Sequence, residues 1–363
     1  MDKLNILFIG VGVDQIPAIE KAKELGLGVY GFDGNPEAKG KSLLDGFECI
    51  DIKDANAVER EARKLNKKVG IDGCMAPATE MGISAGRIID QLSLRGIGEK
   101  VATQLTDKVM RRTLFDELGI NQPLWMEASE FLPSAWANKD NNYLPCVIKP
   151  KNQSAAVGVK LIETKEQLKE EEFDLVEEYL EGWELSTEVL VLENGMFIVA
   201  NADRNYDKKL KWKPYLLEDG CQIPSKIPPR IARKIMDLIA KLVTSLSLRS
   251  CAIKLDLLIK DNLIYVIECA PRMGGGKLSS KMIPLAYGID WWKIAIKLAM
   301  GIPLEDGELL PKHNKFVAQR YLFPENPKSH RDRIKDFIET GETYEEAVKN
   351  AQEKVYEATL PTT

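Results

Sequence analysis

Histidine is scarce in this chain of 363 residues, which contains only His313 and His330. Both lie late in the chain in polar surroundings, which argues against a histidine-based catalytic triad and against a histidine metal site. The six cysteines are scattered and follow neither a CxxC pattern nor a zinc-ligand spacing. We therefore expect reduced cysteines in a cytoplasmic protein.

Long apolar runs and concentrated positive charge are also missing. No run reaches transmembrane length, and the N-terminus enters a predicted strand without a signal-peptide pattern. The net charge is −5 with Lys and Arg spread along the chain, so neither a nucleic acid nor a membrane is an expected partner. A composition of 44% hydrophobic and 29% charged residues is typical of a globular protein with two or three domains.

Alternating strand and helix patterns predict a small doubly wound domain at the N-terminus. The predicted strands are 4–9, 28–32, 46–51 and 69–75, and the predicted helices are 14–25, 55–66 and 80–91. Gly10 and Gly12 match the start of a GxGxxG motif, and Asp33 stands about where a ribose-binding acid would. Gln15 replaces the third glycine, so NAD or FAD binding is a weakly supported alternative.

The segment 145–162 predicts a hairpin whose loop suits phosphate. Strand 145–150 carries Lys149 near its end, residues 151–158 are small and polar, and 159–162 is the return strand. The amides of such a loop can wrap phosphate oxygens, with Lys149 as a fixed positive charge beside them. The alternative for Lys149 is a solvated strand end, because most lysines are exposed.

Two further predicted strands, 175–179 and 184–192, follow a predicted helix at 106–118. The first strand ends in the acidic pair Glu177 and Glu178 beside a glycine turn. This pair could bind an adenine amino group and a ribose. The alternative interpretation is a charged edge strand.

The most informative stretch is the predicted hairpin of strands 252–258 and 263–268. Asp256 and Glu268 can project from one face of this hairpin, and two carboxylates close together suit Mg²⁺ shared with substrate phosphates. Lys254 points to the same side as Asp256 because side chains alternate along a strand. Arg272 and three glycines follow at once. This inventory fits phosphoryl chemistry, and the alternative is an ordinary hairpin with a salt bridge.

The remaining segments predict core elements and one basic loop. Strand 197–202 leads into the loop 203–213, whose lysines could cover an anionic substrate or form a solvated face. Helix 228–247 has one apolar face, and helix 283–301 carries Trp291 and Trp292, which we expect in the core. A strand near 314–323 and an acidic helix at 343–355 complete the chain.

In this order the segments resemble the ATP-grasp superfamily, the fold of biotin carboxylase, carbamoyl-phosphate synthetase and the D-alanine–D-alanine ligases. The resemblance covers about residues 1–310 and is carried by the motifs FDGNPEAKG, IDGCMAP, TDKVMRRTLFDELGINQP, PCVIKP, KNQSAAVGV, VEEYLEGWE and ECAPRMGGG. It implies an α/β chain (α+β ATP-grasp), with a small doubly wound N-terminal domain before a two-lobed ATP-grasp domain with antiparallel sheets. The implied division is 1–105 for the N-terminal domain, 106–185 for the central subdomain, 186–310 for the C-terminal lobe and 311–363 for an extension whose role is open.

The resemblance also assigns roles to residues at matching motif positions. The implied ATP-binding residues are Lys108, Lys149, Lys151, Ser154, Gly158, Glu177, Glu178, Tyr179, Leu180 and Glu184. Asp256 and Glu268 match the metal ligands, and Arg272 and Lys254 match catalytic positions. Arg204, Lys211, Gly274 and Gly275 are the implied substrate residues. Ala270 stands where many members have an asparagine ligand, which leaves the number of metal ions open.

The implied activity is that of an ADP-forming carboxylate–amine ligase that uses ATP and Mg²⁺, with Mn²⁺ as an alternative metal. A carboxylate would be activated as an acyl phosphate and transferred to an amine or another nucleophile. The alternatives are an enzyme that activates bicarbonate or formate, as carboxylases and carbamoyl-phosphate synthetases do, and a non-catalytic nucleotide-binding protein. The expected partners are a small-molecule carboxylate and amine, with a homodimer as a common state in the family. No glutaminase or biotin-carrier domain is expected.

Overall fold

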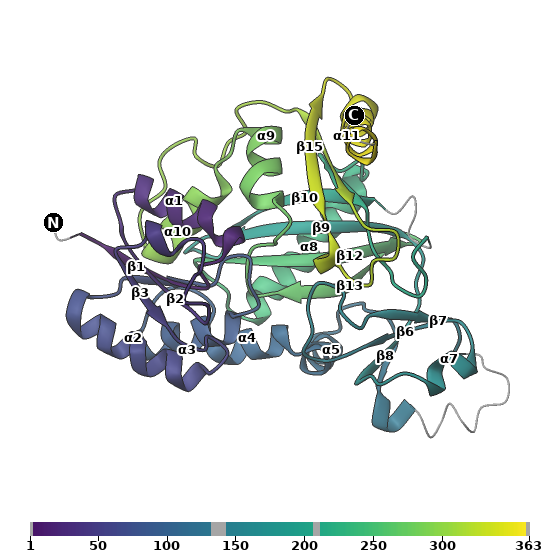
Figure 1. Cartoon of the computed structure of the whole chain (residues 1–363), viewed down its shortest axis with the longest axis horizontal. Coiled ribbons are helices and arrows are strands. Elements are labelled where there is room, and N and C mark those ends of the chain that lie inside the picture. Colours follow the sequence, from purple (N-terminus) through teal and green to yellow (C-terminus); the bar gives the residue numbers. More distant parts are fainter. Residues whose placement is uncertain (1–2, 132–142, 206–210, 361–363) are drawn as a thin grey trace.

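The computed structural model describes residues 3–131, 143–205 and 211–360. Its elements form three sheets with helices on their outer faces, as Figure 1 shows. The N-terminal sheet lies at one end of the molecule, a long seven-stranded sheet crosses the middle, and a small four-stranded sheet lies at the other end. The predicted fold class, a parallel N-terminal sheet followed by antiparallel sheets, is confirmed.

The N-terminal sheet is parallel with the order β3-β2-β1-β4. Its core forms around β1, a continuous apolar run that is buried on both faces, whereas the edge strand β3 is partly exposed. The strands are β1 (Asn5–Ile9), β2 (Gly28–Asp33), β3 (Gly46–Cys49) and β4 (Gly73–Met75), and the helices are α1 (Ile16–Glu24), α2 (Ala55–Val69) and α3 (Gly82–Leu92). These elements match the predicted ones to within a few residues.

The turn after β1 is closed by hydrogen bonds to one side chain at the end of β2 and one that follows the turn. The Asp33 carboxylate accepts a hydrogen bond from the Val11 N–H at 2.8 Å, and the Gln15 side chain accepts one from the Gly12 N–H at 2.8 Å. These are the backbone amides that would face a pyrophosphate in a dinucleotide site. Because these amides already donate to side chains of the protein, they are not free to bind a pyrophosphate, which argues against the NAD or FAD alternative.

The central sheet is antiparallel with the order β13-β12-β9-β10-β11-β14-β15. One face packs on α4, α5 and α8 around Leu185, Val189, Ile253 and Leu255, and the other face packs toward α1 and α10 around Leu190 and Ala200. The strands are β9 (Trp183–Val191), β10 (Phe197–Asn205), β11 (Gly220–Ile223), β12 (Cys251–Lys260), β13 (Leu263–Ala270), β14 (Phe316–Leu322) and β15 (Lys335–Gly341). The helices are α4 (Glu99–Thr106), α5 (Lys108–Glu117), α8 (Pro229–Ser245), α9 (Ile283–Tyr287), α10 (Trp291–Met300) and α11 (Tyr344–Thr359).

The small sheet has the order β5-β8-β6-β7 and a separate core that includes Ile148, Ile162 and Val176. Its elements are β5 (Trp125–Glu127), β6 (Cys146–Lys149), β7 (Lys160–Ile162), β8 (Leu175–Glu178) and α7 (Lys165–Lys169). The predicted hairpin of strands 145–150 and 159–162 is confirmed as the pair β6 and β7. The small sheet thus carries the loop 151–158 at one edge.

Two predicted elements need correction. The single helix predicted at 283–301 is wrong, because Gly288 has a φ of +70° after α9 and the Asp290 side chain caps α10 by accepting from the Lys293 N–H at 2.9 Å. Trp291 and Trp292 are buried, as predicted. The loop predicted at 203–213 is wrong at its start, because β10 continues to Asn205 and pairs with β11. Lys208 and Lys209 lie outside the described residues.

The C-terminal segment joins the central sheet. β14 pairs with β11 and β15 pairs with β14, so the sheet continues into the segment after residue 310. The division of the chain at residues 105, 185 and 310 stays a prediction. Within the described residues, no helix is long and apolar enough to cross a lipid bilayer.

Candidate active site

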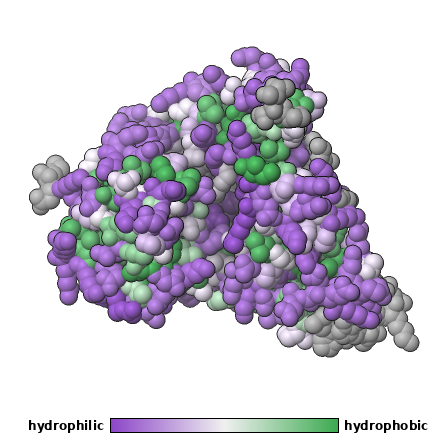
Figure 2. Space-filling view, viewed as in Figure 1, coloured by the Kyte–Doolittle hydropathy of each residue, from purple (hydrophilic) through white to green (hydrophobic). Residues whose placement is uncertain are grey.

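Strand register places the charged residues of four strands on one face of the central sheet. Asp256 on β12 lies opposite Glu268 on β13 and opposite Ser186 on β9. Lys254, two residues earlier, lies opposite Glu188. Residues two apart share a face, so these side chains project together, and Arg204 on β10 reaches the same place. Figure 2 shows a hydrophilic hollow in the middle of the molecular face that is in view, between the N-terminal sheet and the small sheet.

Asp256 is held by two cations and a hydroxyl. Its Oδ2 lies 2.5 Å from the Lys254 Nζ and 3.1 Å from an Arg204 nitrogen, and its Oδ1 accepts a hydrogen bond from the Ser186 hydroxyl at 3.1 Å. Only 5% of the residue is exposed. A buried carboxylate needs such partners, and a metal ion bound here would share Asp256 with these two cations.

Glu268 stays ionised although it is half-buried. Burial alone would raise its pKa, but Lys254, Arg111, Lys108 and Arg272 surround it and hold the pKa well below its usual range. A carboxylate that is ionised at neutral pH is the form that binds a metal ion. Lys254 and Arg272 are also paired with Asp256 and Glu80, whereas Lys108 and Arg111 have no carboxylate within ion-pair distance among the described residues and suit phosphate oxygens.

The donor set fits Mg²⁺ only with help from substrate or water. Within residues 3–131, 143–205 and 211–360, no group of three or more His, Cys, Asp or Glu side chains could hold a metal ion. Ala270 is buried beside Lys254 and offers no ligand. Two carboxylates with the remaining positions filled by phosphate or water are a common environment for Mg²⁺. The residues therefore fit the metal that the resemblance implies.

Lys108 reaches the loop 151–158 from the first turn of α5. That turn begins at Lys108 because Asp107 caps the helix, accepting from the Val109 and Met110 N–H groups at 2.9 and 3.0 Å. The Lys108 Nζ donates to the carbonyl of Gln153 at 2.5 Å. Burial lowers the pKa of Lys108 to about 8, and the charge of Glu268 offsets this effect only in part.

Lys149 is part of a buried triad with Glu177 and Arg112. The Lys149 Nζ lies 2.6 Å from the Glu177 Oε2, and an Arg112 nitrogen lies 2.8 Å from the Oε1. Burial opposes ionisation of Glu177, but the two cations outweigh it and lower its pKa to about 2. Burial also lowers the pKa of Lys149. The Glu177 side chain thus positions Lys149.

The loop 151–158 has an uncommon backbone. Ala155 and Ala156 have φ angles of +56° and +58°, and Gly158 has +72°. Non-glycine residues seldom adopt this left-handed region, and they cluster at functional sites where they do. Ser154 and Lys151 lie in this loop, and the Lys151 N–H donates to the Asp174 carboxylate at 2.9 Å.

The segment from Glu178 to Glu184 joins the small sheet to the central one. Glu178 is exposed and accepts a hydrogen bond from the Leu124 N–H at 3.4 Å, whereas Leu180 is buried. Burial, followed by the charge of Glu181, raises the pKa of Tyr179 to about 12. Glu184 pairs in register with Leu258, two residues beyond Asp256. It therefore lies on the face that carries Asp256.

Arg272 and the glycines connect the central sheet to the N-terminal sheet. Arg272 forms a close ion pair with Glu80, which precedes α3, and donates to the carbonyl of Met273 at 3.0 Å. The Gly274 N–H donates to the buried Glu188 Oε1 at 2.8 Å. A side chain at Gly275 would meet no atom within 4 Å. The loop therefore offers an open backbone beside Lys254.

Among the predicted substrate residues, Arg204 and the glycines lie at the site, but Lys211 does not contact it. Lys211 is exposed, and its Nζ lies 5.0 Å from the centre of the Trp212 ring. Arg204 joins Asp256 to Glu218, whose Oε2 lies 2.5 Å from an Arg204 nitrogen. The basic and aromatic composition of 203–213 alone could not show that Arg204 is buried at the site and that Lys211 is exposed.

Sequence reasoning missed Glu188, Arg111 and Arg112. Glu188 is wholly buried, and burial raises its pKa to about 7. The Glu188 Oε2 is buried and has no hydrogen-bond partner among the described residues. The nearby Ser279 hydroxyl is buried and unpaired among these residues as well. The sequence did contain one signal for Glu188. Side chains alternate along a strand, so Glu188 shares a face with Ser186 and Leu190, and a glutamate at such an inward position of an apolar strand indicates a buried charge.

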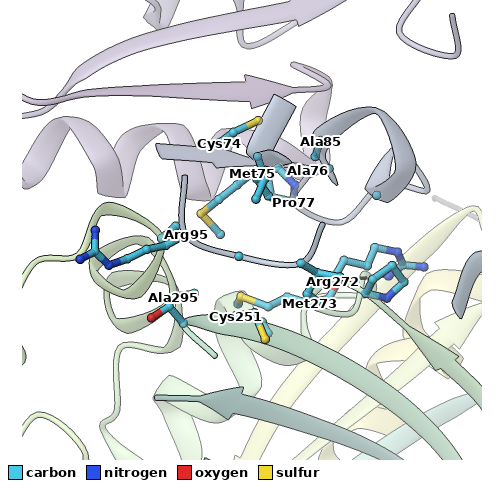
Figure 3. Close-up of a pocket in the computed structure, with 18 of the residues that line it drawn as sticks. Cys74, Met75, Ala76, Pro77, Ala85, Arg95, Cys251, Arg272, Met273 and Ala295 are labelled. Atoms are coloured by element: carbon cyan, nitrogen blue, oxygen red, sulfur yellow. Dashed lines mark hydrogen bonds between the residues drawn. The ribbon is translucent and has the colours of Figure 1, made fainter. Parts of the chain in front are cut away.

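A small cavity lies where Arg272 meets the N-terminal sheet. Figure 3 shows Met75 and Pro77 at the end of β4 on one side of it and Met273 with Cys251 on the other. Its volume is about 70 Å³, and the lining is mostly apolar. A cavity of about 150 Å³ holds a single benzene molecule, so this smaller one has no room for a nucleotide.

Comparison with known proteins gives a consistent family and fold. Residues 105–276 match the family described as ATP-grasp domain. The D-alanine–D-alanine ligase of Desulforudis audaxviator is 25% identical over 240 residues, which cover 61% of this chain and 77% of that protein. The crystal structure of phosphoribosylglycinamide synthetase from Anaerococcus prevotii has a TM-score of 0.75 at 22% identity and covers 98% of each chain. The crystal structure of L-amino acid ligase from Bacillus licheniformis has a TM-score of 0.78 at 18% identity, with the same coverage.

Proposed function

The chain contains an ATP-grasp domain, the ATP-binding fold of the carboxylate–amine ligase superfamily, and from this premise we propose that it is an ATP- and Mg²⁺-dependent ligase that forms ADP. Its substrates are a small-molecule carboxylate and an amine or other nucleophile. The observation that carries the proposal is the pairing of Asp256 with Glu268 among the cations Lys254, Arg111, Lys108 and Arg272. The curated relative and two structural neighbours named above are themselves ligases or synthetases.

The first step is transfer of the γ-phosphoryl group to the carboxylate. A carboxylate oxygen forms a bond to the γ-phosphorus while the bond from that phosphorus to the bridging oxygen of ADP breaks. Lys108 and Lys149 bind the phosphate oxygens, and the loop 151–158 covers them. Asp256 and Glu268 would hold Mg²⁺, which neutralises the phosphate charge that develops as ADP leaves.

The second step is attack of the nucleophile on the acyl phosphate. The amine nitrogen forms a bond to the carbonyl carbon, a proton leaves the nitrogen, and the carbon–oxygen bond to phosphate breaks. Lys254 and Arg272 stabilise the negative charge that develops on the carbonyl oxygen. No nucleophilic side chain is required in either step. The enzyme acts by positioning, by electrostatic stabilisation and by excluding water from the acyl phosphate.

The test is release of ADP from Mg·ATP, measured with a matrix of carboxylic acids and amines. ADP and phosphate formation that requires one acid and one amine together is the expected result and identifies both substrates. ADP release that bicarbonate or formate alone stimulates would replace the proposal with the carboxylase-like alternative. Tight binding of ATP without ADP release in any combination would favour a nucleotide-binding protein.

The residues assigned to ATP, metal and substrate remain part of this proposal, as does the homodimer. Substitution of Lys149 and Asp256 in the same assay tests the residue assignments. Sedimentation at several concentrations tests the assembly.

A further inference from the structure

Arg333 lies in the C-terminal segment but reaches the candidate site. A side chain at Gly276, the last of the three glycines, would lie 3.6 Å from the Arg333 Nη1 and 3.3 Å from the Tyr321 hydroxyl. Arg333 therefore borders the glycine loop from the side of β14 and β15. The sequence pattern gave it no role, because it stands in a polar connection after the last recognised motif.

Two contacts fix the orientation of the Arg333 guanidinium. Its Nε donates to the carbonyl of His330 at 2.9 Å, and its Cζ lies 4.3 Å from the centre of the Tyr321 ring. Tyr321 is itself held, because its hydroxyl donates to the Gln319 side chain at 3.1 Å. An arginine that is stacked and anchored in this way loses little conformational freedom when it binds an anion.

Several other basic side chains around the site have acidic partners, whereas Lys108 and Arg111 donate to the backbone carbonyls of Gln153 and Leu105. Lys254 pairs with Asp256, Arg272 with Glu80, and Lys277 with Asp336 at 2.6 Å. Arg204 pairs with Asp256 and with Glu218. Within the part of the chain that the structure describes, no carboxylate lies within ion-pair distance of Arg333. Its two terminal nitrogens are thus available as a fork for a carboxylate or phosphate.

Arg333 is also linked to the predicted metal ligands by a chain of direct contacts. Asp256 contacts Arg204, Arg204 contacts Glu218, and the Glu218 Oε2 lies 2.7 Å from the His330 Nε2. The His330 carbonyl then accepts from Arg333, and the His330 N–H donates to the carbonyl of Ala155 in the loop 151–158 at 3.0 Å. The Arg333 guanidinium is therefore held between the glycine loop and the loop that would cover the ATP phosphates.

We propose that Arg333 binds an anionic group of the substrate, a carboxylate or a phosphate, that lies apart from the reacting carboxylate. The substrate class is then an acid that carries a second negative group. This inference rests on the proposed function, because it assigns a group to the substrate of that same site. It also gives the C-terminal segment a role as one wall of the substrate pocket.

Binding of two simple anions tests the subsite without turnover. The protein is saturated with Mg²⁺ and the non-hydrolysable ATP analogue AMP-PNP, which fills the γ-phosphate position. Inorganic phosphate and succinate are then titrated by calorimetry. We expect saturable binding of at least one probe to the unchanged protein and a loss of at least tenfold in affinity in Arg333→Gln. Tighter binding of phosphate indicates a phosphorylated substrate, and tighter binding of succinate indicates a second carboxylate.

Two further variants keep the result interpretable. Arg333→Lys retains a point charge without the fork, so its affinity should lie between those of the unchanged protein and Arg333→Gln. Lys335→Gln removes an exposed charge two residues away, whose Nζ lies over the Phe337 ring, and it should bind both probes normally. The subsite would be overturned if Arg333→Gln and the unchanged protein bound the probes with equal affinity. It would also be overturned if the unchanged protein bound neither probe.

The same variants separate this inference from the proposed function. Probe binding that depends on Arg333, together with no ADP release in the acid and amine matrix, would refute the ligase and leave the anion site. In a second outcome, Arg333→Gln slows ADP release equally for every acid but leaves the affinity for both probes unchanged. Arg333 would then act on the transferred phosphoryl group, and the subsite would be overturned.

Discussion

The Lys149 ammonium and the Glu177 carboxylate form a buried ion pair at 2.6 Å, and Arg112 binds the other oxygen of the same carboxylate. The Arg112 guanidinium also donates to the carbonyls of Val266 and Ile267 at 2.8 and 2.9 Å. Because those carbonyls belong to β13, the triad ties the small sheet to the strand that carries Glu268. One buried carboxylate therefore aligns Lys149, the proposed ATP-binding lysine, with the proposed metal site.

Substitution of Glu177 by Gln should destabilise the protein strongly. Lys149 and Arg112 would remain buried without a counter-charge, which costs about 3–5 kcal/mol in comparable buried pairs. Urea unfolding followed by circular dichroism measures the effect. Glu178→Gln is the matched control, since this neighbour is exposed and should change the unfolding free energy by less than about 0.5 kcal/mol. Equal midpoints for the two variants would show that the triad adds no stability.

Affinity for ATP should fall at high pH because of Lys108. Its pKa of about 8 means that the ammonium group loses its proton as the pH rises above that value. Binding of AMP-PNP with Mg²⁺, measured by calorimetry from pH 7 to 9.5, should therefore weaken in the upper half of this range. Lys108→Arg keeps its charge throughout and should show a flatter profile. A Lys108→Arg profile as steep as that of the unchanged protein would contradict the role of this lysine.

Asp256→Asn and Glu268→Gln should each remove Mg²⁺-dependent turnover. The loss should be at least about 100-fold, because each side chain would supply one of the two carboxylates proposed to hold the metal against the phosphates. Asp261→Asn provides a control on the same hairpin, since Asp261 is exposed at the turn with a φ of +53° that asparagine also adopts. Full activity in either site variant, with the fold intact, would rule out the metal assignment.

Glu188 should make the protein less stable as the pH rises toward neutrality. Its pKa is about 7 in the folded protein and about 4.5 in the unfolded chain, so the folded state binds this proton more tightly. The contribution of Glu188 to the free energy of unfolding is therefore fully present below pH 4.5. It is lost as the pH rises through 7, and the total loss is about 3 kcal/mol.

Glu188→Gln isolates this contribution. The variant should match the unchanged protein near pH 5 and exceed it in stability at pH 8, because the amide has no charge to desolvate. Thermal unfolding at the two pH values measures the difference. The opposite order at pH 8 would mean that the ionised carboxylate is stabilised by its neighbours after all.

Much of the fold could be predicted because its signals are local. Apolar runs and glycine turns gave the N-terminal sheet and the hairpin of β12 and β13, whose strands lie within two residues of the predicted ones. The structure also brings Lys108, Lys149, Asp256 and Glu268 toward one region, as an ordered set of motifs suggested. Short strands such as β11 and β15 were missed, because four residues or a mixed pattern such as KDFIETG carry little periodicity.

Contacts between distant segments explain what the sequence could not predict. Arg112 looks like a surface residue in the helical pattern TDKVMRRTLFDEL, yet it is wholly buried by β8 and β13. Arg333 meets the glycine loop only because β14 and β15 extend the central sheet across the site. Such pairings are set by sheet order, which no local pattern in this chain specified.

Gly274 and Gly275 of the glycine loop should differ sharply in their tolerance of a side chain. An added Cβ at Gly274 would lie 2.3 Å from the Glu188 Oε1, whereas one at Gly275 would meet nothing within 4 Å. Gly274→Ala must therefore displace either Glu188 or the loop, and it should lower both the unfolding midpoint and the rate of ADP release. Gly275→Ala should leave the unfolding midpoint unchanged. Any effect of Gly275→Ala should appear as a raised KM for the carboxylate or amine, because its backbone faces open space beside Lys254. Urea unfolding and steady-state kinetics on the two variants provide the comparison, and equal destabilisation by both would show that the Gly274 contact with Glu188 does not anchor the loop.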